Sequence, residues 1–213
     1  MLVLTRKTGQ GINISNEIVI TIKEIKGNQV RLGIEASSNF KIYRSEIYEQ
    51  IKAENTQALN LSQETPKNLS NFANTQKIKF NSSRFGELEI NPSAVIEFPF
   101  GLVGIPDAHQ FVMLEYSSPF SWLHSIDHPD IAFVVINGAE LEPQFDVQVL
   151  TADKDIDLRP NDEIALINVV TVRPNIQAST VNVKAPIVVN MRNKKAKQII
   201  IDSTDLSINL PLF

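Results

Sequence analysis

The sequence predicts a mainly β protein made of two unequal parts. In residues 2–43 apolar and polar positions alternate, as they do around Ile18, Ile20 and Ile22, which is the period of a half-buried strand. From Lys77 onward many short strand-like runs return, separated by turn signals such as "INGAE" and "RPND". The predicted strands are "KIKF", "ELEI", "AVIEF", "FVMLEY", "AFVVI", "DVQVL", "IALINVVTV", "TVNV", "IVVNM" and "QIIID". Many short strands without a long helical period are typical of an all-β sandwich or barrel.

The composition is that of an ordinary globular protein and excludes several kinds of site. The 213 residues are 43% hydrophobic and 21% charged, and they include no cysteine. Disulfides, thiolate metal sites and cysteine nucleophiles are therefore excluded, which fits a reducing cytoplasm. No run approaches the roughly 18 apolar residues of a membrane span, and Met1 is followed by a strand pattern instead of a leader. We expect a cytoplasmic protein that does not contact the membrane.

Residues 1–55 form the first predicted module. "KGNQ" (Lys26 to Gln29) predicts a hairpin turn between two strands, and Ser45 can cap a helix that runs to about Asn55. A module of this size buries little surface, and it has neither disulfides nor metal ligands to compensate. Its strand edges are open to pairing with another chain. We therefore expect a homodimer formed through this module.

Residues 56–76 are predicted to be a linker, and residues 77–213 the second module. The linker is rich in Asn, Gln, Ser and Thr, and Pro66 prevents a continuous helix. Its start can be helical, with Ala58, Leu59 and Leu61 able to dock.

Charge is divided unevenly between the two modules. The formal net charge of −4 combines +2 in the first module with −6 in the second. Such an asymmetry suggests an anionic ligand for the first module.

The first module resembles a known family of regulators. "MLVLTRKTGQGINI", "VITI", "GNQVRLGIEA" and "YRSEIYEQI" are similar to the carbon storage regulator family, CsrA, over nearly all of residues 1–55. Two positions depart from the family pattern: Ser37 replaces the usual proline, and Tyr43 replaces the usual histidine. The resemblance implies a strand-exchanged homodimer, in which the first strand of one subunit lies beside the last strand of the other.

The second module resembles the flagellar assembly factor family, FliW. The resemblance rests on "FGELEI", "IEFPFGLVGIPD", "SPFSWLHSIDHPDIAFVV" and "APIVVNMRNKKAKQIIID", and it covers most of residues 78–206. It implies an all-β barrel that binds both CsrA and flagellin. The two resemblances together imply a natural fusion of a regulator with its antagonist.

The CsrA resemblance implies a surface for single-stranded GGA motifs near the ribosome-binding sites of messenger RNAs. Leu4, Arg6 and Arg44 match the RNA-contact positions of the family. Unstacked bases need an apolar platform and hydrogen bonds to their edges, and arginine forks can bind phosphate or guanine. The candidates on the last predicted strand are Phe40, Ile42 and Tyr43. Without the resemblance, the residues alone favour surface arginines and a core leucine.

The FliW resemblance implies a regulatory contact between the two modules. Free flagellin would occupy the FliW-like module, and flagellin export would release it to antagonise the CsrA-like module. The contact residues implied on the first module and its extension are Glu54, Asn55, Ala58 and Leu59. The ordinary chemistry of a helix end and a linker explains the same residues equally well. The contact can form within one subunit or between subunits. Since a tether gives an effective concentration on the order of millimolar, we expect an internal contact weak enough for flagellin to compete.

Three other motifs have structural explanations that we favour. "HSIDHPD" offers His124, Asp127, His128 and Asp130 as metal ligands, but Pro129 and the turn signal favour a loop. "GLVG" lacks the end of a phosphate-binding loop and predicts a tight turn. "RNKKAK" (192–197) can contact RNA or an acidic partner, although a hairpin tip with solvated cations is the simpler interpretation.

The sequence therefore predicts a translational repressor with a built-in antagonist, and it offers no catalytic residues, cofactor or metal. The alternative is a flagellin-binding chaperone that an RNA-inactive CsrA-like module merely dimerises. A β-barrel enzyme is the third possibility, supported only by generic carboxylates.

Overall fold

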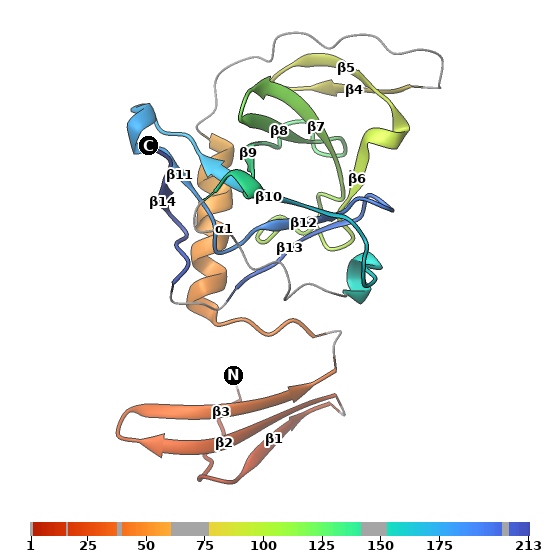
Figure 1. Ribbon diagram of the computed structural model, residues 1–213. Coiled ribbons are helices and arrows are strands. Elements are labelled where there is room, and N and C mark those ends of the chain that lie inside the picture. Colours follow the sequence, from red (N-terminus) through yellow and green to blue (C-terminus); the bar gives the residue numbers. More distant parts are fainter. Residues whose placement is uncertain (1, 16, 38–39, 61–76, 142–152, 202–204) are drawn as a thin grey trace. The chain divides into compact units, whose positions relative to one another are not determined.

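The chain forms two compact units in a computed structural model, residues 1–43 and residues 44–213 (Figure 1). The structure describes residues 2–15, 17–37, 40–60, 77–141, 153–201 and 205–213. The predicted strand "DVQVL" and most of the predicted linker, including Leu61 and Pro66, lie outside these residues. None of the described helices combines the length and apolar character that a membrane crossing requires.

The first unit is a three-stranded antiparallel sheet in the order β1-β2-β3. Its strands are β1 (Gly11–Ile14), β2 (Ile18–Lys26) and β3 (Gln29–Ala36). The predicted hairpin at "KGNQ" is present, with Lys26 opposite Gln29 and Gly27 at a φ of 56°. Residues 2–7 and 40–43 belong to no strand in the described single chain. These are the two segments that the CsrA resemblance pairs between subunits.

The first unit has almost no core of its own. Among its described residues only Ile22 is buried, at 9% exposed. Most of the large apolar side chains that are exposed in the described chain lie in this unit: Leu2, Val3, Leu4, Ile14, Val19, Ile25, Val30, Leu32, Ile34, Phe40 and Ile42. A sheet whose apolar side chains remain in contact with water needs a further surface to cover it.

The helix α1 (Ser45–Asn60) begins where the sequence predicts and extends beyond the predicted end near Asn55. It belongs to the second unit, because it packs on β9 and β10 of the barrel. The additional helical residues include Ala58, fully buried, and Leu59, half-buried in the main core cluster. Packing of this apolar face against the barrel explains the extension, since tertiary contacts supply most of the stability of a protein helix.

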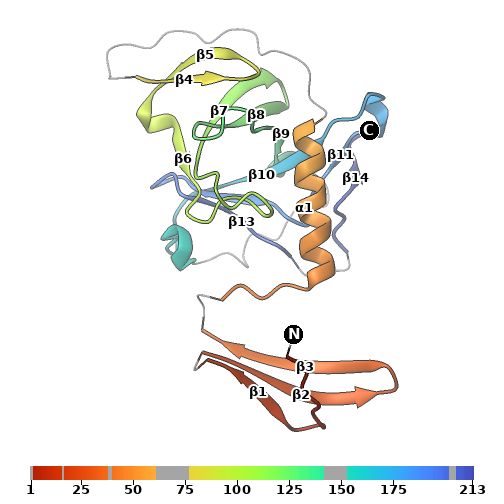
Figure 2. The same ribbon diagram turned by 180° about the vertical axis from the view of Figure 1, so that it is seen from behind.

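The second unit is a nearly closed β-barrel, as the sequence predicts. Its large sheet follows the order β13-β12-β10-β9-β8-β7-β6. β11 pairs with β10 and β14 pairs with β11, while β4 and β5 form a separate hairpin. A bridge between Glu97 and Lys195 joins the ends of β6 and β13. Figure 2 shows the same unit from behind, with α1 beside the strands. The strands are β4 (Ile78–Ser82), β5 (Gly86–Ile90), β6 (Val95–Glu97), β7 (Gln110–Ser117), β8 (Phe120–Ser125), β9 (Ala132–Asn137), β10 (Ile164–Thr171), β11 (Thr180–Val181), β12 (Ile187–Asn190), β13 (Ala196–Gln198) and β14 (Leu210–Pro211).

Short 3-10 helices punctuate the barrel: η1 (Pro92–Ala94), η2 (Gly138–Glu140), η4 (Lys154–Ile156) and η5 (Ile176–Ala178). In each case an Asn or Asp side chain caps the first turn.

The barrel buries two large apolar clusters. One contains Phe98, Phe111, Leu123 and Phe133 and includes Ala58 of α1. The other contains Trp122, which is 1% exposed, as expected for a core residue. The helix that the sequence assigns to the small module therefore completes the core of the large one.

Candidate functional site

The contact between α1 and the barrel is the best-defined candidate site in the described residues. Its helix face consists of Ile51, Glu54, Asn55 and Ala58, which follow the i, i+3, i+4, i+7 spacing and are all buried. Three of the four predicted partner-contact residues lie on this face. The fourth, Leu59, is half-buried and packs beside Ala58.

Asn55 forms the first polar anchor of the contact. Its side-chain nitrogen donates to the carbonyl of Val103 at 3.0 Å and to Oε1 of Gln198 at 2.9 Å, and its oxygen accepts from Nε2 of Gln198 at 3.4 Å. Gln198 Nε2 also donates to the carbonyl of Ala185. Asn55 is fully buried, so loss of these bonds would leave a desolvated amide without a partner.

Glu54 forms the second polar anchor. Its carboxylate is 6% exposed and accepts a hydrogen bond from the hydroxyl of Thr171 on β10. One turn further along the helix, Gln57 accepts from the guanidinium of Arg173 at 3.0 Å on the exposed rim. Burying a charged carboxylate without hydrogen bonds costs free energy. The neutral donor Thr171 therefore helps Glu54 to remain buried in this contact.

The "GLVG" segment forms the barrel wall beside the helix. Leu102 and Ile105 exchange backbone hydrogen bonds, which confirms the predicted tight turn. Gly104 has a φ of 83°, and a Cβ added there would overlap the Cγ of Lys52. The glycine therefore allows the turn to approach α1 closely, and it presents the Val103 carbonyl to Asn55.

The residues predicted to contact RNA divide between the two units. Leu4 is 43% exposed. Arg6 is half-buried and donates to two backbone carbonyls of its own unit, Gly11 at 3.1 Å and Thr5 at 2.8 Å. Their side chains thus lie on the first unit, where the opening segment turns into β1.

The remaining predicted RNA residues precede α1 directly. Phe40 is 39% exposed and Ile42 is 47% exposed, while Tyr43 is half-buried. Arg44 has an exposed side chain, and its carbonyl accepts from the N–H of Tyr48 at 3.0 Å, so it closes the first turn of α1. Arg44 is therefore bonded directly to the first residue of α1, and its carbonyl belongs to the first turn of this helix, which packs on the barrel.

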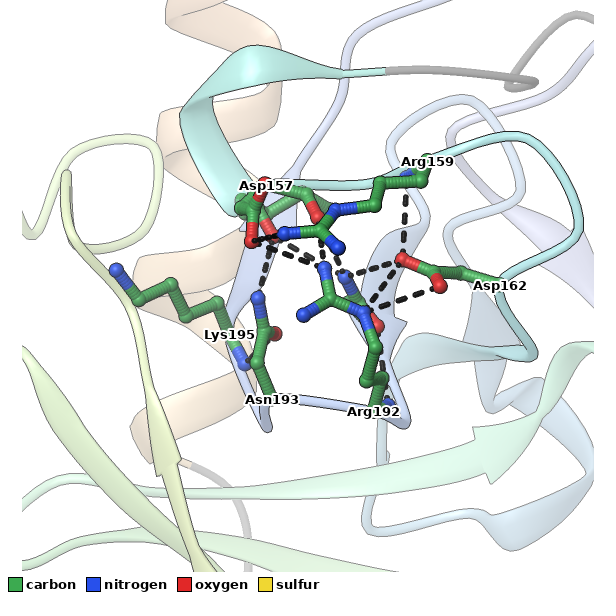
Figure 3. Close-up of polar contacts among 8 residues, drawn as sticks. Asp157, Arg159, Asp162, Arg192, Asn193 and Lys195 are labelled. Carbon is green, nitrogen blue, oxygen red and sulfur yellow. Dashed lines mark hydrogen bonds and ion pairs between the residues drawn. The ribbon is translucent and has the colours of Figure 1, made fainter.

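The cationic tip between β12 and β13 is bound to neighbouring carboxylates (Figure 3). Arg192 contacts Asp157 at 2.9 Å and Asp162 at 3.1 Å. The hydrogen bond from Arg192 lowers the pKa of the Asp157 carboxyl. The hydrogen bonds to Asp157 and Asp162 in turn raise the pKa of the Arg192 guanidinium. Lys197 pairs with Asp153 and Asp155. The tip therefore fastens the segment around η4, which is a more specific role than the solvated cations expected from the sequence.

The residues of "HSIDHPD" have separate structural roles. His124 is fully buried; its Nδ1 donates to the carbonyl of Ser125 at 2.5 Å, and its Nε2 accepts from the hydroxyl of Ser82 at 2.6 Å. Burial lowers the pKa of His124. Asp127 accepts from the backbone N–H of His109 and Gln110. The described residues contain no group of ligands suited to a metal ion.

The barrel side of the helix contact was not found by sequence reasoning. Gln198, Thr171 and Val103 come from three distant parts of the chain, and no local spacing connects them. The one available signal was the glycine pair in "GLVG". Glycine next to an apolar run can indicate a turn with a positive φ, where the backbone approaches another element closely.

Comparison with known families matches both modules. Residues 79–212 match the family model described as FliW protein, and residues 1–53 match the CsrA model, described as the global regulator protein family. The CsrA match covers the first unit and the first half of α1.

Individual relatives cover the second module. The flagellar assembly factor FliW of Natranaerobius thermophilus is 32% identical over 140 residues, which are 64% of this chain and 93% of the relative. That of Caldanaerobacter subterraneus is 35% identical over 139 residues, covering 63% of this chain and 93% of the relative. A crystal structure of the flagellar assembly factor FliW superimposes with a TM-score of 0.54 at 26% identity, over 63% of this chain and 96% of that one.

Proposed function

Because the chain belongs to the FliW family through residues 79–212 and carries a CsrA domain at residues 1–53, we propose that it is a translational regulator joined to its own antagonist. The CsrA domain binds GGA motifs near the ribosome-binding sites of messenger RNAs, notably flagellin mRNA, and represses their translation. The FliW domain restrains the CsrA domain and binds flagellin, which links flagellum assembly to flagellin synthesis. The protein acts in the cytoplasm.

The observation that carries this proposal is the docking of α1 on the barrel. The helix starts directly after Arg44, and the bond from Tyr48 to the Arg44 carbonyl makes that residue part of the first turn. Glu54 and Asn55 hold the same helix to the barrel. A barrel that holds α1 therefore restricts where Arg44 can lie, which restricts the RNA surface that needs Arg44 beside Arg6 of another subunit.

Flagellin acts in this proposal by displacing α1. The helix fills the barrel surface formed by Val103, Thr171 and Gln198. A partner that binds this surface must remove the helix first, and removal frees Arg44 for RNA. The acidic barrel and the mildly basic CsrA domain are complementary in charge, which assists orientation more than affinity.

Dimerisation of the CsrA domain is part of the proposal. The first unit buries only Ile22 among its described residues, while its apolar side chains remain exposed. The segments 2–7 and 40–43 belong to no strand of the described single chain, and a second copy of this unit would cover both the strand edges and the apolar surface.

The test is RNA binding by the full chain with and without flagellin. We expect weak binding of a GGA-containing RNA by the wild-type chain and tighter binding after flagellin is added. Asn55→Asp places a carboxylate against Gln198 Oε1 and the Val103 carbonyl and should bind RNA tightly without flagellin. Thr56→Asp is the matched control, because it adds the same charge on the exposed face of α1. Equal RNA affinity in all four samples would contradict self-antagonism.

A chaperone dimerised by an RNA-inactive CsrA module remains the second candidate, favoured by Ser37 and Tyr43, which depart from the family pattern. Arg44→Ala separates the two functions. It should abolish retention of the RNA and leave flagellin binding unchanged if the first proposal holds. A full chain that binds flagellin but never binds GGA-containing RNA, even as Asn55→Asp, would favour the chaperone. Neither function needs a catalytic residue or a cofactor.

A further inference from the structure

The C-terminal segment 205–213 runs beside α1 in both views of the molecule (Figures 1 and 2). Its side chains alternate between exposed and half-buried from Asp205 to Phe213. The half-buried residues Leu206, Leu210 and Leu212 pack on the cluster around Trp122, whereas α1 packs on the other large cluster. The segment thus connects the helix to the opposite half of the barrel core.

Asn209 makes the direct connection to the helix. Its carboxamide satisfies both polar atoms when the nitrogen faces the helix; in this orientation it donates to both carboxylate oxygens of Glu54 at 3.0 Å and to the carbonyl of Ile208 at 3.2 Å. The Thr171 hydroxyl donates to the same carboxylate from the barrel. Glu54 is therefore recognised jointly by a barrel strand and by the C-terminal segment.

Packing between the helix and the segment is otherwise incomplete. A groove of about 380 Å³ separates them, lined by Gln50, Ala53 and Glu54 of α1 and by Lys184, Leu206, Ser207, Ile208 and Asn209. Asn209 and Glu54, which both line this groove, are the hydrogen-bonded pair that joins the two elements here.

The segment is attached to the barrel by few backbone bonds. β14 pairs with β11 at two positions only, Thr180 with Pro211 and Val181 with Leu210. Two further bonds run from Val183 N–H to the Ser207 carbonyl and from Leu212 N–H to the Ser179 carbonyl. Short edge strands with exposed ends open at lower free energy than core strands. We therefore expect the segment to open at a lower free energy than the central strands of the barrel, although opening also exposes Leu206, Leu210 and Leu212.

We propose that residues 205–213 form a strap that holds α1 on the barrel, with Asn209 as the positioning residue that recognises the Glu54 carboxylate. The strap determines how readily α1 is released from the barrel. It also favours a bound helix that carries a carboxylate in the place of Glu54. The regulatory consequence rests on the proposed function, but helix retention by the strap does not.

The test uses a charge-exchange pair in the full chain. Asn209→Asp sets two carboxylates against each other, and we expect hydrogen exchange of the α1 amides from Ile51 to Leu59 to become on the order of tenfold faster. Glu54→Gln added to Asn209→Asp restores complementarity with the roles reversed: the amide nitrogen introduced at position 54 donates to the new carboxylate, and the amide oxygen accepts from Thr171. Exchange in the double variant should return to near the wild-type rate.

The amides of β7 to β9 serve as the internal control and should be unchanged in every variant. A chain ending at Ser207 gives an independent test and should exchange α1 at least as fast as Asn209→Asp. The proposal is overturned if Asn209→Asp exchanges α1 at the wild-type rate, or if the double variant is not rescued. RNA affinity of the same variants tests the proposed function separately: faster α1 exchange without tighter RNA binding supports the strap and contradicts self-antagonism.

Discussion

The sheet of the first unit and the barrel of the second are both antiparallel β structures, yet they differ sharply in what they bury. The barrel surrounds fully buried residues such as Phe133 and Leu123, whereas the described sheet has Ile22 as its single buried apolar side chain. Alternating sequence patterns are present in both. The difference shows that a strand pattern specifies which face is apolar, not which chain supplies the surface that covers it.

The helix α1 is where this difference matters most. A 16-residue helix needs tertiary packing to be stable in water, and the small sheet has little core to offer. The barrel supplies both an apolar surface for Ala58 and polar partners for Glu54 and Asn55. Fusion of the two families therefore gives the helix a partner inside the same chain.

The largest expected effect is on the barrel core. Phe133→Ala removes a fully buried ring and should lower the free energy of unfolding of the barrel by about 3–5 kcal/mol. Trp122 is the single tryptophan and lies in the barrel, so its fluorescence in a denaturant titration measures this unit alone. Ile34→Ala in the sheet, where the side chain is 41% exposed, is the comparison and should leave the fluorescence transition unchanged.

The second effect is a concentration dependence confined to the sheet. If a second copy covers the sheet, its binding stabilises the folded sheet. Diluting the protein a hundredfold, to a concentration near the dissociation constant of the dimer, removes up to about 2.7 kcal/mol from the free energy of unfolding of the sheet. Hydrogen exchange of residues 18–36 should therefore accelerate on dilution, while the Trp122 transition of the barrel stays constant. Protection of the sheet that is independent of concentration would mean that this unit is stable as a monomer, and the contrast between the units would fail.

Sequence reasoning predicted much of this architecture because the relevant signals are local. The hairpin at "KGNQ", the helix start at Ser45 and the turn at "GLVG" each depend on residues close in sequence. The strand β8 was missed, because "FSWLHS" shows no simple alternation when most of its residues are buried. The end of α1 was placed too early, because its last turn depends on distant barrel residues.

For the candidate site, the sequence offers residues on the helix side only. Glu54, Asn55, Ala58 and Leu59 came from the family resemblance, and the structure brings all four to the barrel. Their partners Gln198, Thr171 and Asn209 lie far along the chain, where no spacing rule connects them to a helix. Geometry was needed to identify them.

The third effect is on the docking of α1 against the barrel within the second unit. Gln198→Ala leaves the Asn55 amide buried without its side-chain partner and should weaken docking of α1 by about 1–3 kcal/mol. Hydrogen exchange of residues 51–59 in the full chain measures this loss. Gln110→Ala, an exposed position on β7, is the matched control. If α1 remains as protected as in the wild-type chain, packing of Ile51 and Ala58 alone holds the helix and the polar anchor is dispensable.

The smallest effect concerns the exposed ion pairs of the barrel, which contrast with its buried anchors. The bond from Arg192 lowers the pKa of Asp157 in the folded protein. The pair therefore stabilises the folded barrel fully at pH values above the ordinary aspartate pKa of about 3.9. This stabilisation is lost as the pH falls through the lowered pKa of Asp157 in the folded protein. Arg192→Gln should raise the pKa of Asp157 in a carboxyl NMR titration and reduce the melting temperature slightly at neutral pH. The two proteins should converge in strong acid.

Lys195→Gln is the control for that comparison, because it removes a charge from the same turn and leaves the Arg192 pairs in place. Exposed pairs contribute little, since water screens both charges and the side chains lose freedom when they pair. A loss of stability with Arg192→Gln as large as that with Gln198→Ala would contradict this ranking. It would mean that the segment around η4 supports the barrel as strongly as the buried contacts of α1 do.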